Sequence, residues 1–163
     1  MIREATSSDA QAIVDIYNHY IIHSHATFEL EAITSQDMKG RLDKVIKFHK
    51  LPWLVMEVDQ KIVGYAYSTE WKARKAYAKT TETSIYLHKD AHGKGYGKQL
   101  YTELLNVLKE LGFHVLIGGV SLPNEASAKL HESLGFKKAA EFKEVGYKFD
   151  RWIDVGYWQL VFD

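Results

Sequence analysis

The sequence predicts an α/β domain in which helices pack on both faces of a sheet. Patterns typical of strands and of helices alternate in the order strand, two helices, three strands, helix, strand, helix and two strands. A glycine-rich stretch, Leu87–Leu100, joins one of these strands to the next helix. The 163 residues are the size of one domain, and no repeat or linker divides them. We therefore expect a single domain over residues 1–163.

The composition excludes several classes of function. Lysine plus arginine number 21 and aspartate plus glutamate number 21, so no overall charge favours nucleic acid or an anionic membrane as a partner. The absence of cysteine excludes disulfides, thiolate metal sites and a cysteine nucleophile. No apolar stretch approaches the length of a membrane span, which leads us to expect a cytoplasmic protein. Ten tyrosines and four tryptophans indicate a substrate pocket and a dimer interface.

The first part of the chain predicts one strand and two helices. Ile2–Ala5 reads as a short strand, and Ser8-x-x-Gln11 reads as a capping box that opens the first helix. Thr34 begins the second helix, which Pro52 ends. His23 and His25 lie between the helices without a third ligand nearby, so we expect solvated loop histidines and no metal site. The apolar positions at helical spacing are Ile13, Ile16, Tyr17, Tyr20 and Ile21, then Met38, Leu42, Val45 and Ile46.

The middle of the chain predicts three strands. Trp53–Val58 and Lys61–Ser68 flank Asp59-Gln60, which suggests an antiparallel hairpin with a tight turn. Trp71–Tyr77, a loop of cations and aromatics, separates this hairpin from a third strand at Thr81–Leu87.

The last part predicts two helices and three strands. One helix carries Leu100, Leu104, Leu108 and Leu111 and stops at Gly112. Phe113–Val120 is a near-continuous apolar run, as in a central strand. Pro123 and Asn124 then open a helix that Gly135 closes, and Phe136–Phe162 forms two long strands joined around Gly146–Asp150.

The stretch Leu87–Leu100 has the character of an anion cradle. Glycines 93, 95 and 97 permit positive φ and leave the backbone amides free to face a ligand. The start of the following helix adds unpaired N–H groups and the positive end of its dipole, which suits a pyrophosphate. The spacing fits neither a Walker loop, since Gln99 follows Gly97-Lys98, nor the dinucleotide fingerprint G-x-G-x-x-G. A glycine-rich turn without a ligand is the alternative.

The loop Leu87-His88-Lys89-Asp90-Ala91-His92-Gly93-Lys94-Gly95-Tyr96-Gly97 resembles the acetyl-CoA pyrophosphate loop of the GNAT acyltransferase superfamily, V-x-P-x-x-R/Q-G-x-G-x-G/A. Lys89 replaces the usual proline, and His92 replaces the usual Arg or Gln. The resemblance implies a mixed sheet of about seven strands with helices on both faces, in which Thr81–Leu87 and Phe113–Val120 splay apart around acetyl-CoA. The cofactor-binding residues it implies are Ile85, Tyr86, Leu87, His92, Gly93, Lys94, Gly95, Tyr96, Gly97, Lys98, Asn124 and Ser127.

Two side chains are candidates for catalysis of acetyl transfer. Glu82 lies in an otherwise uncharged strand that, in the resembled fold, ends at the acetyl group, so we predict a general base; an exposed strand glutamate is the alternative. A backbone N–H around Ile85–Leu87 is expected to polarise the thioester carbonyl. His131 stands where many GNAT enzymes have a tyrosine that protonates the CoA thiolate. It is either that acid, a group that binds CoA or substrate, or a histidine at the edge of the core.

Five short sequence segments along the chain resemble the phosphinothricin/methionine sulfoximine N-acetyltransferase branch of this superfamily. That branch acts on small α-amino acids with a polar tail. Arg74 and Lys72 suit a carboxylate or phosphinate, and Trp71, Phe28 and Tyr77 suit the aliphatic stem; a solvated basic loop is the alternative. The family also implies a homodimer. The five segments are Asn18-His19-Tyr20-Ile21, Pro52-Trp53-Leu54-Val55, Trp71-Lys72-Ala73-Arg74, Leu122-Pro123-Asn124 and Asp154-Val155-Gly156-Tyr157-Trp158-Gln159-Leu160.

Other functions remain open. A non-catalytic acyl-CoA sensor would keep the glycine loop, but Glu82 argues against it. An acetyltransferase of peptides or polyamines would favour acidic residues around its target, which the cationic Lys72/Arg74 loop disfavours.

Overall fold

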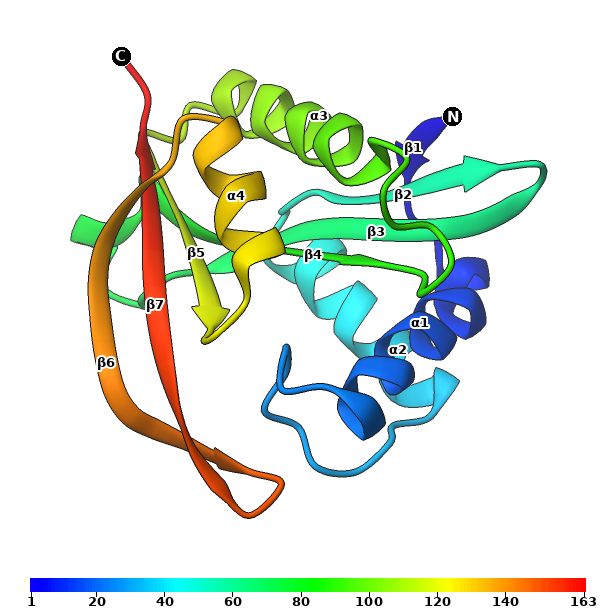
Figure 1. Cartoon of the computed structure of the whole chain (residues 1–163). Helices are drawn as coiled ribbons and strands as arrows, with labels where there is room; N and C mark the ends of the chain where they lie inside the picture. Colours follow the sequence, from blue (N-terminus) through cyan, green and yellow to red (C-terminus); the bar gives the residue numbers. More distant parts are fainter.

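The computed structural model describes residues 1–163, and its sheet confirms the predicted α/β fold class (Figure 1). The seven strands lie in the order β1-β2-β3-β4-β5-β7-β6. The predicted order of elements is also confirmed. The elements are β1 (Ile2–Glu4), α1 (Ala10–His23), α2 (Ser35–Asp43), β2 (Trp53–Val58), β3 (Lys61–Glu70), β4 (Thr80–Leu87), α3 (Tyr96–Glu110), β5 (Val115–Ser121), α4 (Glu125–Ser133), β6 (Lys137–Lys148) and β7 (Arg151–Val161).

The sheet has a hydrophobic core on each face. Because side chains alternate along a strand, Trp53 and Val55 of β2 pack with α1 and α2, whereas Leu54 and Met56 pack with α3. Tyr65 of β3 is 1% exposed within the first core, and the second core contains the leucines predicted for α3. Helices therefore cover both faces, as predicted. No helix of the chain is long and apolar enough to span a bilayer.

Two local predictions have different outcomes. The hairpin at Asp59-Gln60 is confirmed, because both residues have positive φ and Val58 pairs with Lys61. The capping box at the first helix is placed wrongly. Thr6 and Asp9 form it instead, around a short 3-10 turn that precedes α1. Gln11 contributes no cap, because its side-chain amide donates to Asp15 at 2.8 Å.

The site depends on how β4 and β5 separate. These parallel strands pair over only four positions, from Thr80↔Val115 to Thr83↔Gly118. Beyond this point Ser84–Leu87 pairs with β3 alone, and Gly119–Ser121 pairs with β7 alone. The sheet therefore opens after Thr83 and Gly118, as the resemblance implied.

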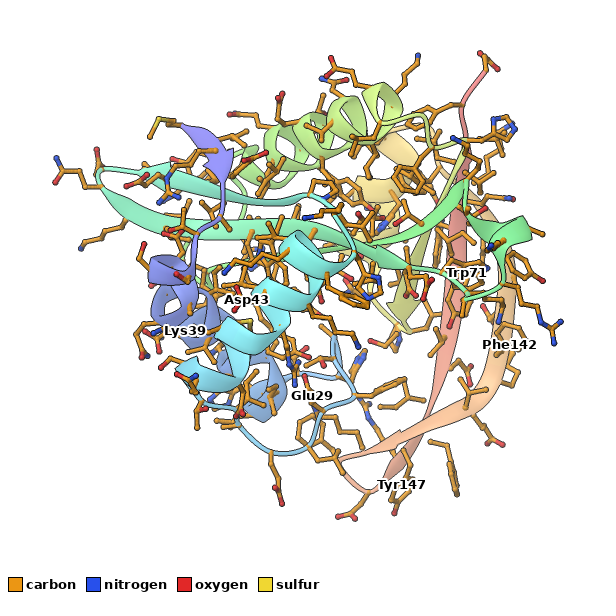
Figure 2. All side chains as sticks on the ribbon, turned by 180° about the vertical axis from the view of Figure 1, so that it is seen from behind. Glu29, Lys39, Asp43, Trp71, Phe142 and Tyr147 are labelled. Carbon is orange, nitrogen blue, oxygen red and sulfur yellow. The ribbon has the colours of Figure 1, made fainter.

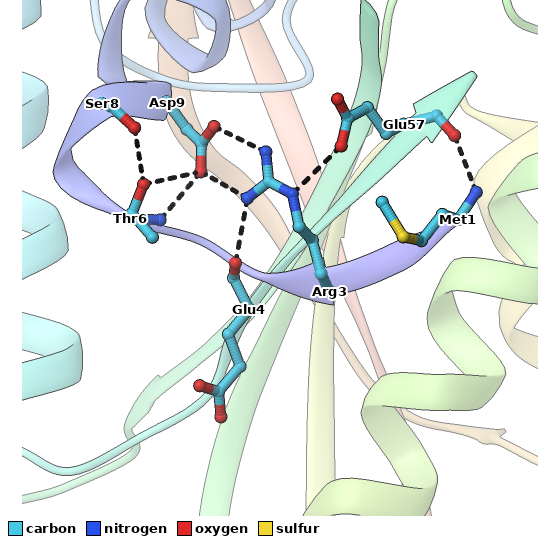
Figure 3. A network of polar contacts seen from close by, with 7 residues as sticks. All are labelled: Met1, Arg3, Glu4, Thr6, Ser8, Asp9 and Glu57. Atoms are coloured by element: carbon cyan, nitrogen blue, oxygen red, sulfur yellow. Dashed lines mark hydrogen bonds and ion pairs between the residues drawn. The ribbon is translucent and has the colours of Figure 1, made fainter. Parts of the chain in front are cut away.

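A polar network fixes the N-terminal strand (Figure 3). The Arg3 guanidinium donates to both oxygens of Asp9, at 2.8 and 2.9 Å, and to Oε2 of Glu57 at 3.1 Å. The Asp9 carboxylate also accepts from the backbone N–H of Thr6 at 2.8 Å. The hydrogen bonds from Arg3 hold the pKa of Asp9 below its ordinary value of 3.8, although burial opposes them. Asp9 therefore stabilises the fold in its ionised form.

We expect Asp9→Asn to lower the free energy of unfolding at pH 7 by about 1–3 kcal/mol, because a buried charge-assisted bond is lost. Since the folded pKa is depressed, the wild-type contribution is complete above the unfolded value near 3.8 and is lost as the pH falls through the folded value. Urea titrations at pH 7 and pH 3 measure this. Asp43→Asn is the control, because its pair with Lys47 is exposed. An equal loss at both pH values would contradict the prediction.

Candidate active site

A cleft of about 200 Å³ lies where β4 and β5 separate. One wall is β4, another is the end of β5, and α4 closes the space between them. Of the predicted cofactor residues, the cleft brings together Ile85, Tyr86, Leu87, His92, Asn124 and Ser127. The other lining residues are Tyr20, Ala26, Thr83, Ser84, Gly119, Val120, Ser121, Ala126, Leu130 and His131.

The glycine loop that continues from β4 is a backbone cradle. Gly93 and Gly95 have φ of +75° and +78°, and no atom lies within 4 Å of a Cβ placed on Gly93. Gly95 is the N-cap of α3, whose first turn contains no acidic side chain, so its N–H groups and dipole favour an anion. Lys94 and Lys98 are exposed beside it. The loop therefore fits a pyrophosphate held by backbone amides.

Tyr20 of α1 fixes the entrance to this loop. Its hydroxyl donates to the Leu87 carbonyl and lies 3.0 Å from Nε2 of His92, the residue that replaces the usual Arg or Gln of the motif. In the sequence, Tyr20 is an apolar position of a helix and part of the segment Asn18-His19-Tyr20-Ile21, and neither feature predicts these contacts. Its role at the cleft depends on the packing of α1 against β4.

His131 is buried on the α4 side of the cleft, where both of its ring nitrogens have partners. Nδ1 lies 2.7 Å from the carbonyl oxygen of Ser127, so Nδ1 carries the proton. Nε2 lies 3.0 Å from the Tyr101 hydroxyl. Burial lowers the pKa of His131, and the bond to the Ser127 carbonyl opposes this only in part. The ring is therefore neutral near pH 7. Asn124 caps α4 by accepting from the Ser127 N–H at 3.1 Å.

Glu82 lies on the opposite face of β4 from Thr83, which the Tyr101–His131 pair contacts. Its carboxylate has no hydrogen bond or ion pair, and burial raises its pKa above the ordinary 4.5. Glu82 does not line the cleft itself. However, its Oε2 is 3.8 Å from a Cβ placed on Gly119, which does line the cleft and has no side chain to block the way. The carboxylate thus borders the opening between the strands.

The predicted substrate residues fall into separate groups. Trp71 lies beside β7 (Figure 2), with its ring 6.0 Å from that of Tyr157, and the Lys72 ammonium is 5.2 Å from the Trp71 ring. Lys72, Arg74 and Tyr77 line a second hollow of about 270 Å³ with Thr80 and Thr81, at the start of β4.

Phe28 lies apart from the Lys72/Arg74 hollow. Its ring packs on the backbone of Gly146 in β6, where a Cβ would come within 2.9 Å of Cε1 and closer still to Cζ. Lys148 Nζ donates to the neighbouring Thr27 carbonyl at 2.8 Å, so the loop after α1 is attached to the β6–β7 hairpin (Figure 1). The structure thus does not bring all five predicted substrate residues into one hollow.

Several residues at the site were missed in the sequence. Thr83, Tyr101 and Gly119 carry no recognisable local signal, because their roles depend on the register of β4, α3 and β5. Ser121 is another such residue: it donates to the His25 carbonyl at 2.5 Å and lies 2.8 Å from the Nδ1 of His25. No group of three or more His, Asp or Glu side chains is arranged to hold a metal ion.

A sheet that splays beside an anion-binding glycine loop, with an unpaired carboxylate at the opening, defines an acyl-CoA-dependent acyltransferase. The acetyltransferase (GNAT) domain family matches residues 2–156, and the chain belongs to this family. It is an acetyltransferase that uses acetyl-CoA.

Similar proteins agree with this assignment. The chain is 40% identical over 162 residues to a phosphinothricin N-acetyltransferase of Streptomyces viridochromogenes, covering 99% of this chain and 87% of that one. It is 35% identical to an L-methionine sulfoximine/L-methionine sulfone acetyltransferase of Salmonella typhimurium, covering 99% and 94%. A solved phosphinothricin acetyltransferase from Sinorhizobium meliloti, in complex with acetyl-CoA, superposes with a TM-score of 0.95 at 31% identity, covering 99% and 87%.

Proposed function

We propose that this enzyme acetylates the α-amine of a small amino-acid analogue of the phosphinothricin or methionine sulfoximine type, by direct transfer with Glu82 as general base. One observation carries the mechanism: Glu82 is a half-buried carboxylate without a partner at the opening between β4 and β5. A carboxylate held in this way is expected to have a function other than stabilising the fold. The substrates named for the two curated relatives support the amine class.

The chain's own groups act in sequence. Acetyl-CoA supplies a thioester, whose carbonyl carbon is attacked by the amine. Glu82 takes a proton from the substrate ammonium, and its raised pKa brings it closer to that of the amine. A backbone N–H around Ile85–Leu87, where β4 has no partner on β5, stabilises the negative charge on the carbonyl oxygen. The C–S bond then breaks and its electron pair leaves with the sulfur as a thiolate, while the second amine proton passes to solvent.

For His131, the geometry favours a binding role over acid catalysis. The neutral ring has its one proton on Nδ1, and that proton is donated to Ser127. A thiol titrates near pH 8.5, so the leaving group needs little help from an acid. We propose that His131 forms a fixed wall of the cleft.

The substrate's acidic tail is proposed to bind Arg74 and Lys72, next to Trp71 and Tyr77, whereas Phe28 lies apart from this hollow and is not included. We expect Arg74→Ala to raise the KM of the amine about 10–100-fold, the loss of a hydrogen bond between charged groups. The KM of acetyl-CoA should not change. Steady-state kinetics with each substrate varied in turn measure this, and Lys61→Ala, an exposed cation on β3, is the control. Equal damage to both KM values would place Arg74 at the cofactor.

An amine-acceptor panel tests the proposed function. The released CoA thiol is measured with phosphinothricin, methionine sulfoximine, methionine sulfone, free amino acids, polyamines and short peptides. We expect turnover with the first three. Turnover with peptides or polyamines alone would replace the proposed substrate class, and acetyl-CoA binding without turnover on any amine would indicate a sensor.

We also propose a homodimer. The β6–β7 hairpin exposes large apolar side chains: Phe142 is 52%, Tyr147 53%, Phe149 52% and Trp152 64% exposed. Phe142 and Tyr147 are labelled along this hairpin in Figure 2. An exposed apolar surface of this kind is typical of a protein interface. Sedimentation as a monomer at micromolar concentration would contradict a dimer.

A further inference from the structure

We propose that Tyr101 is a positioning residue of the acetyl transfer, which holds His131 and Thr83 in a one-way hydrogen-bond chain at the point where β4 and β5 separate. The proposal rests on the proposed function for its kinetic consequences only. The chain runs through three elements: Thr83 Oγ1 is 2.5 Å from the Tyr101 hydroxyl, which is 3.0 Å from Nε2 of His131. Thr83 is 3%, Tyr101 0% and His131 4% exposed, so water does not compete for these bonds.

The direction of the chain follows from its last bond. A carbonyl oxygen only accepts, so Nδ1 of the neutral His131 ring donates to Ser127 and Nε2 must accept. Tyr101 therefore donates its single proton to Nε2. Its oxygen in turn accepts from Thr83. The reverse direction would place the Nδ1 lone pair against the Ser127 carbonyl oxygen at 2.7 Å.

The direction of these hydrogen bonds determines whether any of their protons is available to a ligand in the cleft. Thr83 and His131 both line it, and both of their protons are donated inward to the protein. If Thr83 gave its proton to the departing thiolate, Tyr101 would have to become a phenolate, and burial raises the pKa of Tyr101 well above its ordinary value. The hydrogen-bond chain thus fixes the positions of Thr83 and His131 and does not deliver a proton to the leaving group.

The position of this hydrogen-bond chain explains why it should affect the rate of acetyl transfer. Thr83 and Gly118 are the last pair before the strands separate. The His131 ring lies against Gly118, since a Cβ there would come within 2.8 Å of Cδ2. The hydrogen bond between Tyr101 and Thr83 thus links α3 to β4. His131, which is bonded to Tyr101, packs on Gly118 and so brings α4 against β5. We infer that these two hydrogen bonds and the packing of His131 on Gly118 set the width of the opening in which the thioester and the amine meet.

No charged group faces the His131 ring directly. Phe136 and Trp158 pack on it, with ring centroids at 5.1 and 6.4 Å. The charged side chains Glu132 and Lys138 contact Trp158, on the other side of this aromatic packing. Glu82 lies on the other face of β4. The protonation state of His131 is therefore governed by its burial, and its tautomer by Ser127 and Tyr101.

The test combines spectroscopy and kinetics on the full chain. In ¹⁵N NMR of the protein without substrates, we expect His131 at pH 7 to be neutral, with the proton on Nδ1 and a hydrogen-bonded Nε2. Tyr101→Phe should move the Nε2 resonance toward that of a nitrogen without a donor. Tyr65→Phe, a buried tyrosine on the other face of the sheet, should leave it unchanged. A proton on Nε2 of His131, or a doubly protonated ring, would contradict the proposed direction of the hydrogen bonds, whatever amine the enzyme accepts.

For kinetics we expect Tyr101→Phe and Thr83→Val each to lower kcat about tenfold, the cost of slight misplacement of the reacting groups. The KM of the amine should stay within about threefold, since neither residue contacts the proposed amine site. Thr83→Ser should restore kcat, and the double variant should be no worse than either single one, because both break the same chain. Unchanged kcat in both single variants, or losses that multiply, would overturn the positioning role.

Discussion

Glu82→Gln is expected to lower kcat/KM by about 10²–10⁴-fold, the span typical of a lost general base. The side chain keeps its size and lies beside Gly119, so acetyl-CoA should bind as before. In the wild type, the base acts only when deprotonated. Activity should therefore rise with pH through the raised pKa of Glu82, and this acidic limb should disappear in the variant. Initial rates across pH, with binding of acetyl-CoA measured separately, provide the test.

The same substitution should make the fold more stable at pH 7. Burial raises the folded pKa of Glu82 above its ordinary 4.5, so the wild type carries no penalty below that value. The penalty grows as the pH rises to the folded value and remains above it. Glu103→Gln, on the exposed surface of α3, is the control for both activity and stability. An unchanged pH–rate profile in Glu82→Gln would show that the base lies elsewhere.

The fold was predictable because its signals are local. The two-residue turn at Asp59-Gln60 and the glycines before α3 each specify their backbone through a few neighbouring residues. Where a tertiary contact decides, the prediction fails. Ser8-x-x-Gln11 has the form of a capping box, but Arg3 on β1 binds Asp9 and moves the cap to Thr6. No pattern in the sequence places Arg3 beside Asp9.

The candidate site was only partly predictable for a similar reason. Glu82 and His131 could be found by residue type, but the sequence does not show that they lie on opposite faces of the sheet. The structure places His131 against Tyr101 on the α3 side of the sheet, whereas Glu82 projects from the other face of β4. Gly118 and Gly119 look alike in the sequence, yet one makes room for the His131 ring and the other opens the way to Glu82. Such roles depend on which side chains of other elements lie opposite each glycine, and a local sequence pattern does not show this.

Gly118→Ala should destabilise the protein by about 2–4 kcal/mol, from overpacking together with a broken buried hydrogen bond. The new Cβ would lie within 2.8 Å of Cδ2 of His131 and closer still to Nε2. The ring is held by Ser127 and Tyr101 and packs edge-on against Phe136, 5.1 Å away, so any movement away from the new Cβ would break these contacts. Urea denaturation measures the loss.

A double-variant cycle separates this clash from a general effect of alanine in β5. His131→Ala alone leaves a cavity, but in its presence Gly118→Ala should cost much less, because the atoms that it strikes are gone. This cycle can be read from thermal unfolding midpoints even if the single variant is only marginally folded. Gly40→Ala in α2, where no atom lies within 4 Å of the new Cβ, should instead stabilise by about 0.5–1 kcal/mol. If the cost of Gly118→Ala were the same with and without His131, the imidazole would not be what requires glycine at this position.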